Sequence, residues 1–394
     1  MPWTTDPLTA QERTELGLLF EARVARVKAT TEAVFSFRAD APTPFQVNSS
    51  FYHVFGQDPS LIPEDYFTSP AAMTAFQERT SFEQVKNVDD SFVPCLVPWF
   101  GSGVLATGFG CRFQIPAKMD PAVDPVIYPV RTPQDIRAMR LPDPEKDGLM
   151  PAVLRFQRYM KEHSILPVGI TDCQGPLTTA NQLMGYDALI YLMADYPSAL
   201  HALMDTVSEG LIAWVKKQKE VIGEPIDRCF TEQQVYLGEH GGVWISDDDA
   251  ILMSPQSYRE FVVPYNSKIL KAFGGGCIHT CGNTLHQADN LLETEGLRVF
   301  NNYSLHNLKQ LAEMKRRFKD RIVVYLCDFT PDDYAGYFKE IFQYLSPGGL
   351  VIDSQFSPVL ALLKGGQYNA MRRDRFEGRQ QAYAALKSAA TLRR

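Results

Sequence analysis

A histidine and a cysteine that could bind a transition metal lie two residues apart in the stretch from Gly274 to Asn283. The stretch is typical of a short strand that ends at a helix start, and side chains two residues apart on a strand share one face. His279 and Cys281 would therefore point the same way. Zn²⁺ takes imidazole nitrogen and thiolate sulfur in a tetrahedral shell, so this pair could supply half of a zinc site. A buried cysteine beside a hydrogen-bonded core histidine is the common alternative.

The composition is that of an ordinary globular chain. It has 394 residues, of which 45% are hydrophobic and 22% charged, and a formal net charge of −7. An acidic balance without a basic stripe argues against nucleic acid and against an anionic membrane surface as partners. The sequence has no apolar run of about 18 residues and no signal-peptide pattern, so we expect a cytoplasmic protein. The seven cysteines are an odd number in a large chain, which favours free thiols over a disulfide framework.

Short apolar runs alternate with helical stretches along the chain, most regularly in its second part. The runs that predict strands lie near 45 and 92 and at 165–171, 226–230, 277–279, 297–301, 321–326 and 350–353. Strands that are each followed by a helix are typical of βα units and a parallel sheet. Eight such units predict an α/β fold, a (β/α)₈ TIM barrel over residues 41–394, with a doubly wound open sheet as the alternative. Residues 1–40 are predicted to form an N-terminal helical extension, in which Thr9 and Glu12 make a capping box.

Polar residues follow the predicted strands at the ends where barrel enzymes carry their active sites. They are Asp172 and Gln174, Glu232, His279 and Cys281, Asn302 and Tyr303, Cys327 and Asp328, and Asp353 and Gln355. Because they follow neighbouring strands, we predict that these side chains line one cavity. The acidic run Asp247-Asp248-Asp249 is instead predicted to be a solvated turn or a helix start.

Roles within this cavity follow from residue type. Cys327 follows the second strand after that of His279 and Cys281, within reach across a barrel mouth, and we predict it as the third metal ligand. Glu232 is predicted to fill or guard the fourth position. The candidate catalytic residues are Asp172, Glu232 and Asp328, and the candidate substrate-binding residues are Gln174, Asn302, Tyr303 and Gln355. Zinc with an exchangeable position would activate a substrate thiol, or alternatively a water for hydrolysis.

Three stretches resemble the uroporphyrinogen decarboxylase superfamily. They are residues 175–223, the run S-P-Q-S-Y-R-E-F-V-V-P-Y at 254–265, and I-H-T-C-G-N at 278–283. The resemblance implies a (β/α)₈ barrel. True decarboxylases of this superfamily neutralise the carboxylates of their substrate with an early arginine-rich segment, whereas residues 40–110 contain Arg79 as their single arginine. The resemblance therefore disfavours decarboxylation of a porphyrinogen.

The other branch of the superfamily contains zinc-dependent, corrinoid-linked methyltransferases, whose ligands come from an H-x-C motif and a later cysteine. His279 and Cys281 match the motif, but the place of the later cysteine is Ser354-Gln355-Phe356, so Cys327 is the expected substitute. The resemblance implies zinc as the cofactor, a corrinoid as the methyl donor and a thiol as the acceptor. The alternative is a metal-free decarboxylase-like lyase or a protein that binds a small acid or tetrapyrrole. We expect a small-molecule substrate, with a corrinoid protein and a second copy of the chain as candidate partners.

Overall fold

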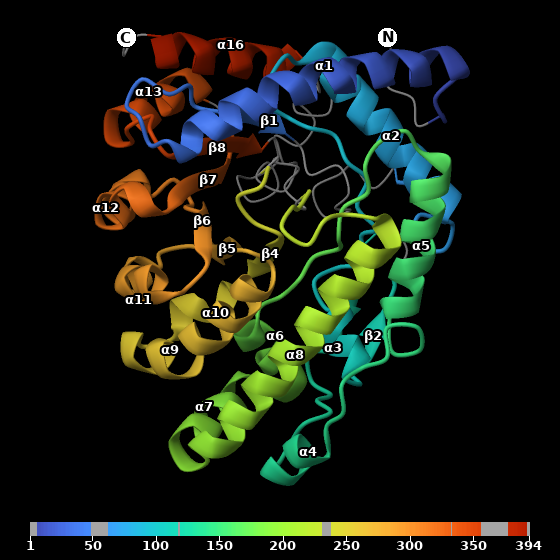
Figure 1. Ribbon diagram of the computed structural model, residues 1–394, viewed down its shortest axis with the longest axis vertical. Helices are drawn as coiled ribbons and strands as arrows, with labels where there is room; N and C mark the ends of the chain where they lie inside the picture. Colours follow the sequence, from blue (N-terminus) through green and yellow to red (C-terminus); the bar gives the residue numbers. More distant parts are fainter. Residues whose placement is uncertain are drawn as a thin grey trace.

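The structure is a computed structural model that describes residues 6–48, 62–116, 119–230, 238–331, 333–355 and 377–391. Its centre is a six-stranded sheet in the order β1-β8-β7-β6-β5-β4, and every pairing within it is parallel. The strands are β1 (Phe45–Asn48), β4 (Val243–Ser246), β5 (Gly276–Cys281), β6 (Leu297–Tyr303), β7 (Val323–Phe329) and β8 (Leu350–Gln355). Helices surround these strands (Figure 1).

Two extended segments complete the ring between β1 and β4. The backbone N–H of Ser91 donates to the carbonyl of Phe45 in β1 at 2.8 Å. Leu96 then forms a parallel bridge with Val168, and Gln174 forms one with Ser246 of β4. The predicted α/β barrel is thus confirmed, with six regular strands and two extended segments joined by single bridges.

The prediction of a strand at 226–230 is wrong, because the strand beside β5 is β4. The ammonium of the buried Lys219 donates to the carbonyls of Pro225, at 3.2 Å, and of Arg228. The same ammonium pairs with Glu224 at 2.6 Å. A side chain therefore occupies backbone acceptors that a strand would use for its ladder.

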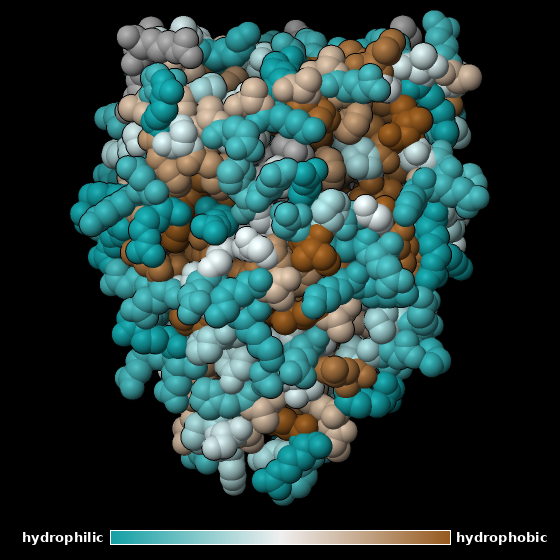
Figure 2. Space-filling view, viewed as in Figure 1, coloured by the Kyte–Doolittle hydropathy of each residue, from teal (hydrophilic) through white to brown (hydrophobic). Residues whose placement is uncertain are grey.

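The helices have the following bounds: α1 (Ala10–Phe35), α2 (Pro70–Asn87), α3 (Val104–Gly108), α4 (Pro133–Ala138), α5 (Met150–His163), α6 (Pro176–Met184), α7 (Tyr186–Asp195), α8 (Pro197–Ile222), α9 (Pro255–Phe261), α10 (Val263–Ala272), α11 (Ala288–Glu293), α12 (Leu308–Phe318), α13 (Tyr334–Tyr344) and α16 (Glu377–Thr391). Short 3₁₀ turns are η1 (Asp248–Leu252), η2 (Leu285–Gln287) and η3 (Lys319–Arg321), and β2 (Phe113–Gln114) pairs with β3 (Ala122–Val123) in antiparallel fashion. Among the described residues no helix is both long enough and apolar enough to cross a membrane. The face in Figure 2 is mostly hydrophilic over the outer helices, with hydrophobic side chains visible between them.

Side chains of the barrel strands alternate between an outer and an inner core. Outward residues such as Ile278, Phe300 and Val324 belong to the large core shared with the helices. Inward residues near the strand starts form a second cluster, which consists of Trp244, Cys277, Val299, Val323, Tyr325 and Val351 together with Val34 of α1. The inner wall is therefore apolar at the amino ends of the strands.

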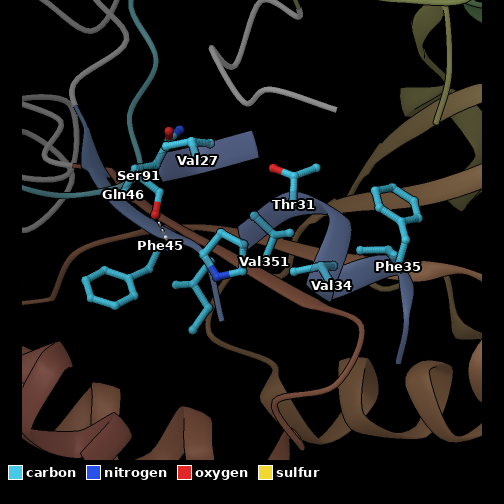
Figure 3. Close-up of a pocket in the computed structure, with 11 residues that line it drawn as sticks. Val27, Thr31, Val34, Phe35, Phe45, Gln46, Ser91 and Val351 are labelled. Atoms are coloured by element: carbon cyan, nitrogen blue, oxygen red, sulfur yellow. Dashed lines mark hydrogen bonds between the residues drawn. The ribbon is translucent and has the colours of Figure 1, made fainter. Parts of the chain in front are cut away.

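Helix α1 closes this amino end. Its first turn has the predicted capping box, in which Thr9 and Glu12 satisfy each other's backbone N–H groups. Its last turns lie against β1 and β8, where they enclose a cavity of about 20 Å³ with room for about one water molecule (Figure 3). The predicted extension thus forms the floor of the barrel, while a domain boundary between residues 40 and 41 stays a prediction.

A buried ion pair fastens α1 to the barrel. The guanidinium of Arg23 donates to Asp90 at 2.8 Å and to the carbonyls of Val85 and Val88 at 3.0 and 2.7 Å. Asp90 also accepts the backbone N–H of Val47 in β1 at 2.8 Å. Burial raises the pKa of the Asp90 carboxyl, and the charge of Arg23 opposes this rise.

We expect the substitution Arg23→Met to lower the free energy of unfolding by about 3–5 kcal/mol, because it leaves the Asp90 carboxylate buried without its cation. Differential scanning calorimetry measures the effect. Arg38→Met is the matched control, since Arg38 and Asp40 are each 70% exposed and their pair should not change the melting temperature. Equal melting temperatures for the two variants would contradict the structural role of Arg23.

Candidate metal centre

Three donor atoms of different chemistry meet at the carboxyl end of β5. A carboxylate oxygen of Asp248, a ring nitrogen of His279 and the sulfur of Cys281 all lie within 4.8 Å of one another. His279 Nε2 is 3.4 Å from Cys281 Sγ and 3.3 Å from Asp248 Oδ1. Zinc bonds of about 2.0–2.3 Å at tetrahedral angles place such donors about 3.3–3.6 Å apart. The spacing in the structure therefore fits a zinc ion.

Neighbouring strands orient the ring of His279. Asn301 of β6 pairs with His279 in register, and its Oδ1 contacts His279 Nδ1. The amide of Asn301 is itself oriented, because its Nδ2 donates to the carbonyl of Tyr325 in β7 at 3.2 Å. Nδ1–H is thus the donor to Asn301, and Nε2 faces Asp248 and Cys281. A partner on the second ring nitrogen is normal for a metal-bound histidine.

The charges at this point also suit a cation. Burial lowers the pKa of His279, but its contacts with Asp248 and Cys281 outweigh burial and raise that pKa well above its usual value. Asp248 Oδ1 is buried and has no hydrogen bond of acceptable geometry among the described residues. A divalent metal would take the place of the proton on Nε2, because metal ligands bind in their deprotonated form.

The turn η1 places Asp248 by anchoring the residues on either side of it. The backbone N–H of Asp247 donates to the carbonyl of His279 at 2.8 Å. The carboxylate of Asp247 accepts Tyr258 Oη at 2.5 Å and Asn266 Nδ2 at 3.1 Å. On the other side, Asn181 Nδ2 donates to the carboxylate of Asp249 at 3.2 Å. Asp248 is therefore the one acid of the three whose carboxylate is directed at His279.

The run Asp247-Asp248-Asp249 is predicted to be a solvated turn or a helix start, and the helix start is confirmed, because η1 begins at Asp248. The solvated turn is wrong for Asp247. Asp247 is fully buried, and burial raises its pKa to about 7. The sequence signal that could have indicated this lies in the 254–265 stretch, which supplies Tyr258 from α9. Recognising the partner of Asp247, however, requires knowing that α9 folds back against this turn.

Cys327 does not join the group around His279 in the described structure. Its thiol is fully buried and lies 3.6 Å from Asp353 Oδ2. Tyr303 stands between Cys281 and Cys327 in register, so two strand spacings, about 10 Å along the sheet, separate the two cysteines. Asp248 thus takes the place that the sequence predicted for Cys327.

Four other predicted residues do face the barrel interior. The carboxylate of Asp172 accepts Gln174 Nε2 at 2.7 Å and Ser246 Oγ at 3.4 Å. Ser246 is the register partner of His279, so β4 lies between Asp172 and the metal donors on β5. Tyr303 donates to Gln355 Oε1, and its ring meets the His279 ring edge to face at 5.4 Å.

Two predicted residues face outward, and one cannot be placed. Asn302 Nδ2 donates to the carbonyls of Thr280, at 2.9 Å, and Gly282, at 3.1 Å, which secures the end of β5. Asp328 accepts Ser304 Oγ at 2.5 Å and the backbone N–H of His306 at 2.7 Å. Both positions alternate with inward residues, so the predictions of substrate binding by Asn302 and catalysis by Asp328 do not agree with their placement. Glu232 lies outside the described residues.

Asp353 is an inward acid to which the sequence analysis assigned no role. It is fully buried, and its Oδ2 accepts Gln355 Nε2 at 3.0 Å. Burial raises its pKa to about 7. The signal in the sequence was its position at the end of the last strand run, next to Gln355.

This raised pKa predicts a pH-dependent contribution to stability. The pKa of an aspartate in an unfolded chain is about 3.9, so the folded protein holds the Asp353 proton more tightly than the unfolded chain does. The stabilisation by protonated Asp353 is then present at low pH and is lost as pH rises through about 7. Between pH 5 and pH 8 the loss should be about 2–3 kcal/mol.

Thermal unfolding of the wild type and of Asp353→Asn at both pH values measures this. The stability of the wild type relative to the variant should fall as pH rises. The control is Asp40→Asn, which alters an exposed carboxylate. The difference in stability between the wild type and this control should stay constant over the same pH range. A constant difference for Asp353→Asn as well would show that Asp353 titrates normally.

The fold and the donor set together define an α/β-barrel protein with a candidate metal centre at the carboxyl ends of its strands. Residues 97–223 match the family model described as uroporphyrinogen decarboxylase. A uroporphyrinogen decarboxylase of Syntrophotalea carbinolica is 28% identical over 161 residues, which are 39% of this chain and 40% of that relative. A methyltransferase from Methanosarcina mazei has a similar fold, with a TM-score of 0.63 and 17% identity over 92% of this chain and 97% of that one. The chain is thus similar to the uroporphyrinogen decarboxylase superfamily over residues 97–223 of its sequence.

Proposed function

We propose that this protein is a zinc-dependent methyltransferase or demethylase of the superfamily, which moves a methyl group between a corrinoid or a methylated substrate and a thiol. The observation that carries the proposal is the meeting of Asp248, His279 and Cys281, whose donor atoms have the separations of a tetrahedral zinc shell. Three protein ligands leave one position for a substrate, as in catalytic zinc sites. The structural similarity to a methyltransferase supports the same barrel architecture for such a reaction.

When bound, zinc would lower the pKa of a substrate thiol and stabilise the thiolate as a nucleophile. The residues of the chain would hold and orient the reacting groups. Asn301 fixes the His279 ring, and the anchored turn η1 holds Asp248. We assign to Asp172, which contacts Ser246 on the intervening strand β4, the acceptance of the proton that the thiol releases.

The barrel offers little support for the decarboxylase alternative in its described part. A polycarboxylate substrate needs cations, and Arg79, the single arginine of residues 40–110, pairs with Glu12 at 2.7 Å outside the barrel interior. A metal-free lyase is therefore the alternative function, which a protein that binds no zinc would favour.

We expect purified protein to contain about one equivalent of zinc, and the single substitutions Asp248→Ala, His279→Ala and Cys281→Ala each to remove most of it, because each deletes one of three ligands. Inductively coupled plasma mass spectrometry measures the content. Cys277→Ala is the matched control, since this cysteine points inward from the same strand but belongs to the apolar cluster. Cys327→Ala should also keep the metal. Loss of zinc in Cys327→Ala together with retention in Asp248→Ala would restore the ligand set predicted from the sequence.

We expect methyl transfer from methylcobalamin to 2-mercaptoethanol, followed by the absorbance change of the corrinoid. The rate should fall about 100-fold or more in Asp248→Ala, because removal of a Lewis acid costs several kcal/mol of activation. Added zinc should not restore this variant, whereas it should restore wild-type protein from which a chelator has removed the metal. A wild type that is free of zinc and inactive in this assay would favour the metal-free reading.

A further inference from the structure

The carboxylate of Asp353 has one oxygen without a hydrogen bond among the described residues. Asp353 is fully buried, and its Oδ2 receives Gln355 at 3.0 Å, Tyr325 at 3.5 Å and the Cys327 thiol at 3.6 Å. The side chain of Gln46, its register partner on β1, also hydrogen-bonds to this carboxylate. Its Oδ1 has no hydrogen-bond partner among the described residues. A buried acceptor without a donor costs about 1–3 kcal/mol, and more if it is charged, so such an atom calls for a ligand.

The protein supplies no cation to this carboxylate in its described part. No Lys or Arg among the described residues forms an ion pair with Asp353. The inward-facing positions of β1 and β4 to β8 are apolar, aromatic, thiol, amide, hydroxyl, histidine or aspartate, and none is Lys or Arg. His279 is engaged by Asp248 and Cys281. Among the described residues, the interior therefore presents acids without a cationic side chain beside them.

Asp353 is placed to act together with the metal centre. Cys281, Tyr303, Cys327 and Asp353 follow one another in register across β5, β6, β7 and β8. Three strand spacings in an eight-membered ring bring Asp353 to the far side of the interior from Cys281. Tyr303, which bonds to Gln355, lies between them, and a tyrosine ring face also attracts a cation.

We propose that Asp353 recognises a positively charged nitrogen of the substrate, so that the barrel selects a small ammonium compound and rejects carboxylates and sulfonates at this position. An N–H of an ammonium group would satisfy Oδ1 with a charge-assisted hydrogen bond. An anion there would face a buried carboxylate with no described cation to offset the repulsion. The inference rests on the proposed function in that the ammonium compound is the substrate of the same site.

Binding of three probes of nearly equal shape tests the charge preference. They are propylammonium, 1-propanol and propionate, titrated into wild-type protein by isothermal calorimetry at pH 8, where most of Asp353 is ionised. We expect propylammonium to bind about 10-fold or more tightly than 1-propanol, and propionate to bind least, because a hydrogen bond to a charged group contributes about 1.5–3 kcal/mol. Equal binding of propylammonium and 1-propanol, or tighter binding of propionate, would overturn the proposal.

Two variants test whether Asp353 causes the preference for propylammonium. Asp353→Asn keeps the side-chain shape and should reduce propylammonium binding to the level of 1-propanol, without loss of zinc. Asp40→Asn removes one exposed negative charge and should leave all three affinities unchanged, which controls for net charge. A preference that survives in Asp353→Asn would refute the role of this residue. Zinc content separates the two proposals, because a metal-free wild type that still prefers propylammonium would refute the metal centre and leave the ammonium site standing.

Discussion

Every second side chain of a barrel strand must enter an interior that the outer helices cannot reach. The polar side chains that point into the interior must therefore find hydrogen-bond partners among one another, and this need explains most of the contacts in the described structure. Near the strand starts the row is apolar and is closed by Val34 of α1. Near the strand ends it turns polar, and the chain from His279 through Asn301 to the Tyr325 carbonyl shows how one side chain orients the next.

The acids with buried oxygens differ in the partners that these oxygens have. Asp90 has the guanidinium of Arg23, and one oxygen of Asp247 accepts the hydroxyl of Tyr258 and the amide of Asn266, although its Oδ1 has no hydrogen bond among the described residues. We interpret both acids as structural anchors. Asp248 and Asp353 each retain a buried oxygen without a hydrogen bond among the described residues. Because desolvating such an atom is costly, we propose a metal ion as the partner of Asp248 and a cationic nitrogen as the partner of Asp353.

The proposed ligand set keeps half of the superfamily pattern that the sequence resembles. The H-x-C pair remains on β5, while the third ligand comes from the turn after β4 in place of a cysteine after the last strand. This exchange replaces a thiolate by a carboxylate, which zinc also accepts. It requires a turn held on both sides, since an acid on a loose loop would point to water. The contacts of Asp247 and Asp249 provide that support.

The sequence by itself determined the fold class, the inward direction shared by His279 and Cys281, and the capping box of Thr9 and Glu12. These follow from local rules, namely the period of two along a strand, strand–helix alternation and capping chemistry. It also indicated the strand ends that carry polar residues. It missed β4 and predicted a strand at 226–230 instead, where the ammonium of Lys219, from the last turn of α8, takes the carbonyls of Pro225 and Arg228.

Only the tertiary structure decided which polar strand-end residues meet. Asn302 and Asp328 follow their strands as closely as Tyr303 and Cys327 do, yet alternation sends the first two outward and the others inward. Asp248 lies beside His279 because β4 and β5 are neighbours in space, with Ser246 and His279 as register partners, although Asp248 precedes His279 by 31 positions in the sequence. The physical reason is that a metal site is a set of distances between side chains, and those distances are set by strand order and register, which no local pattern in the chain encodes.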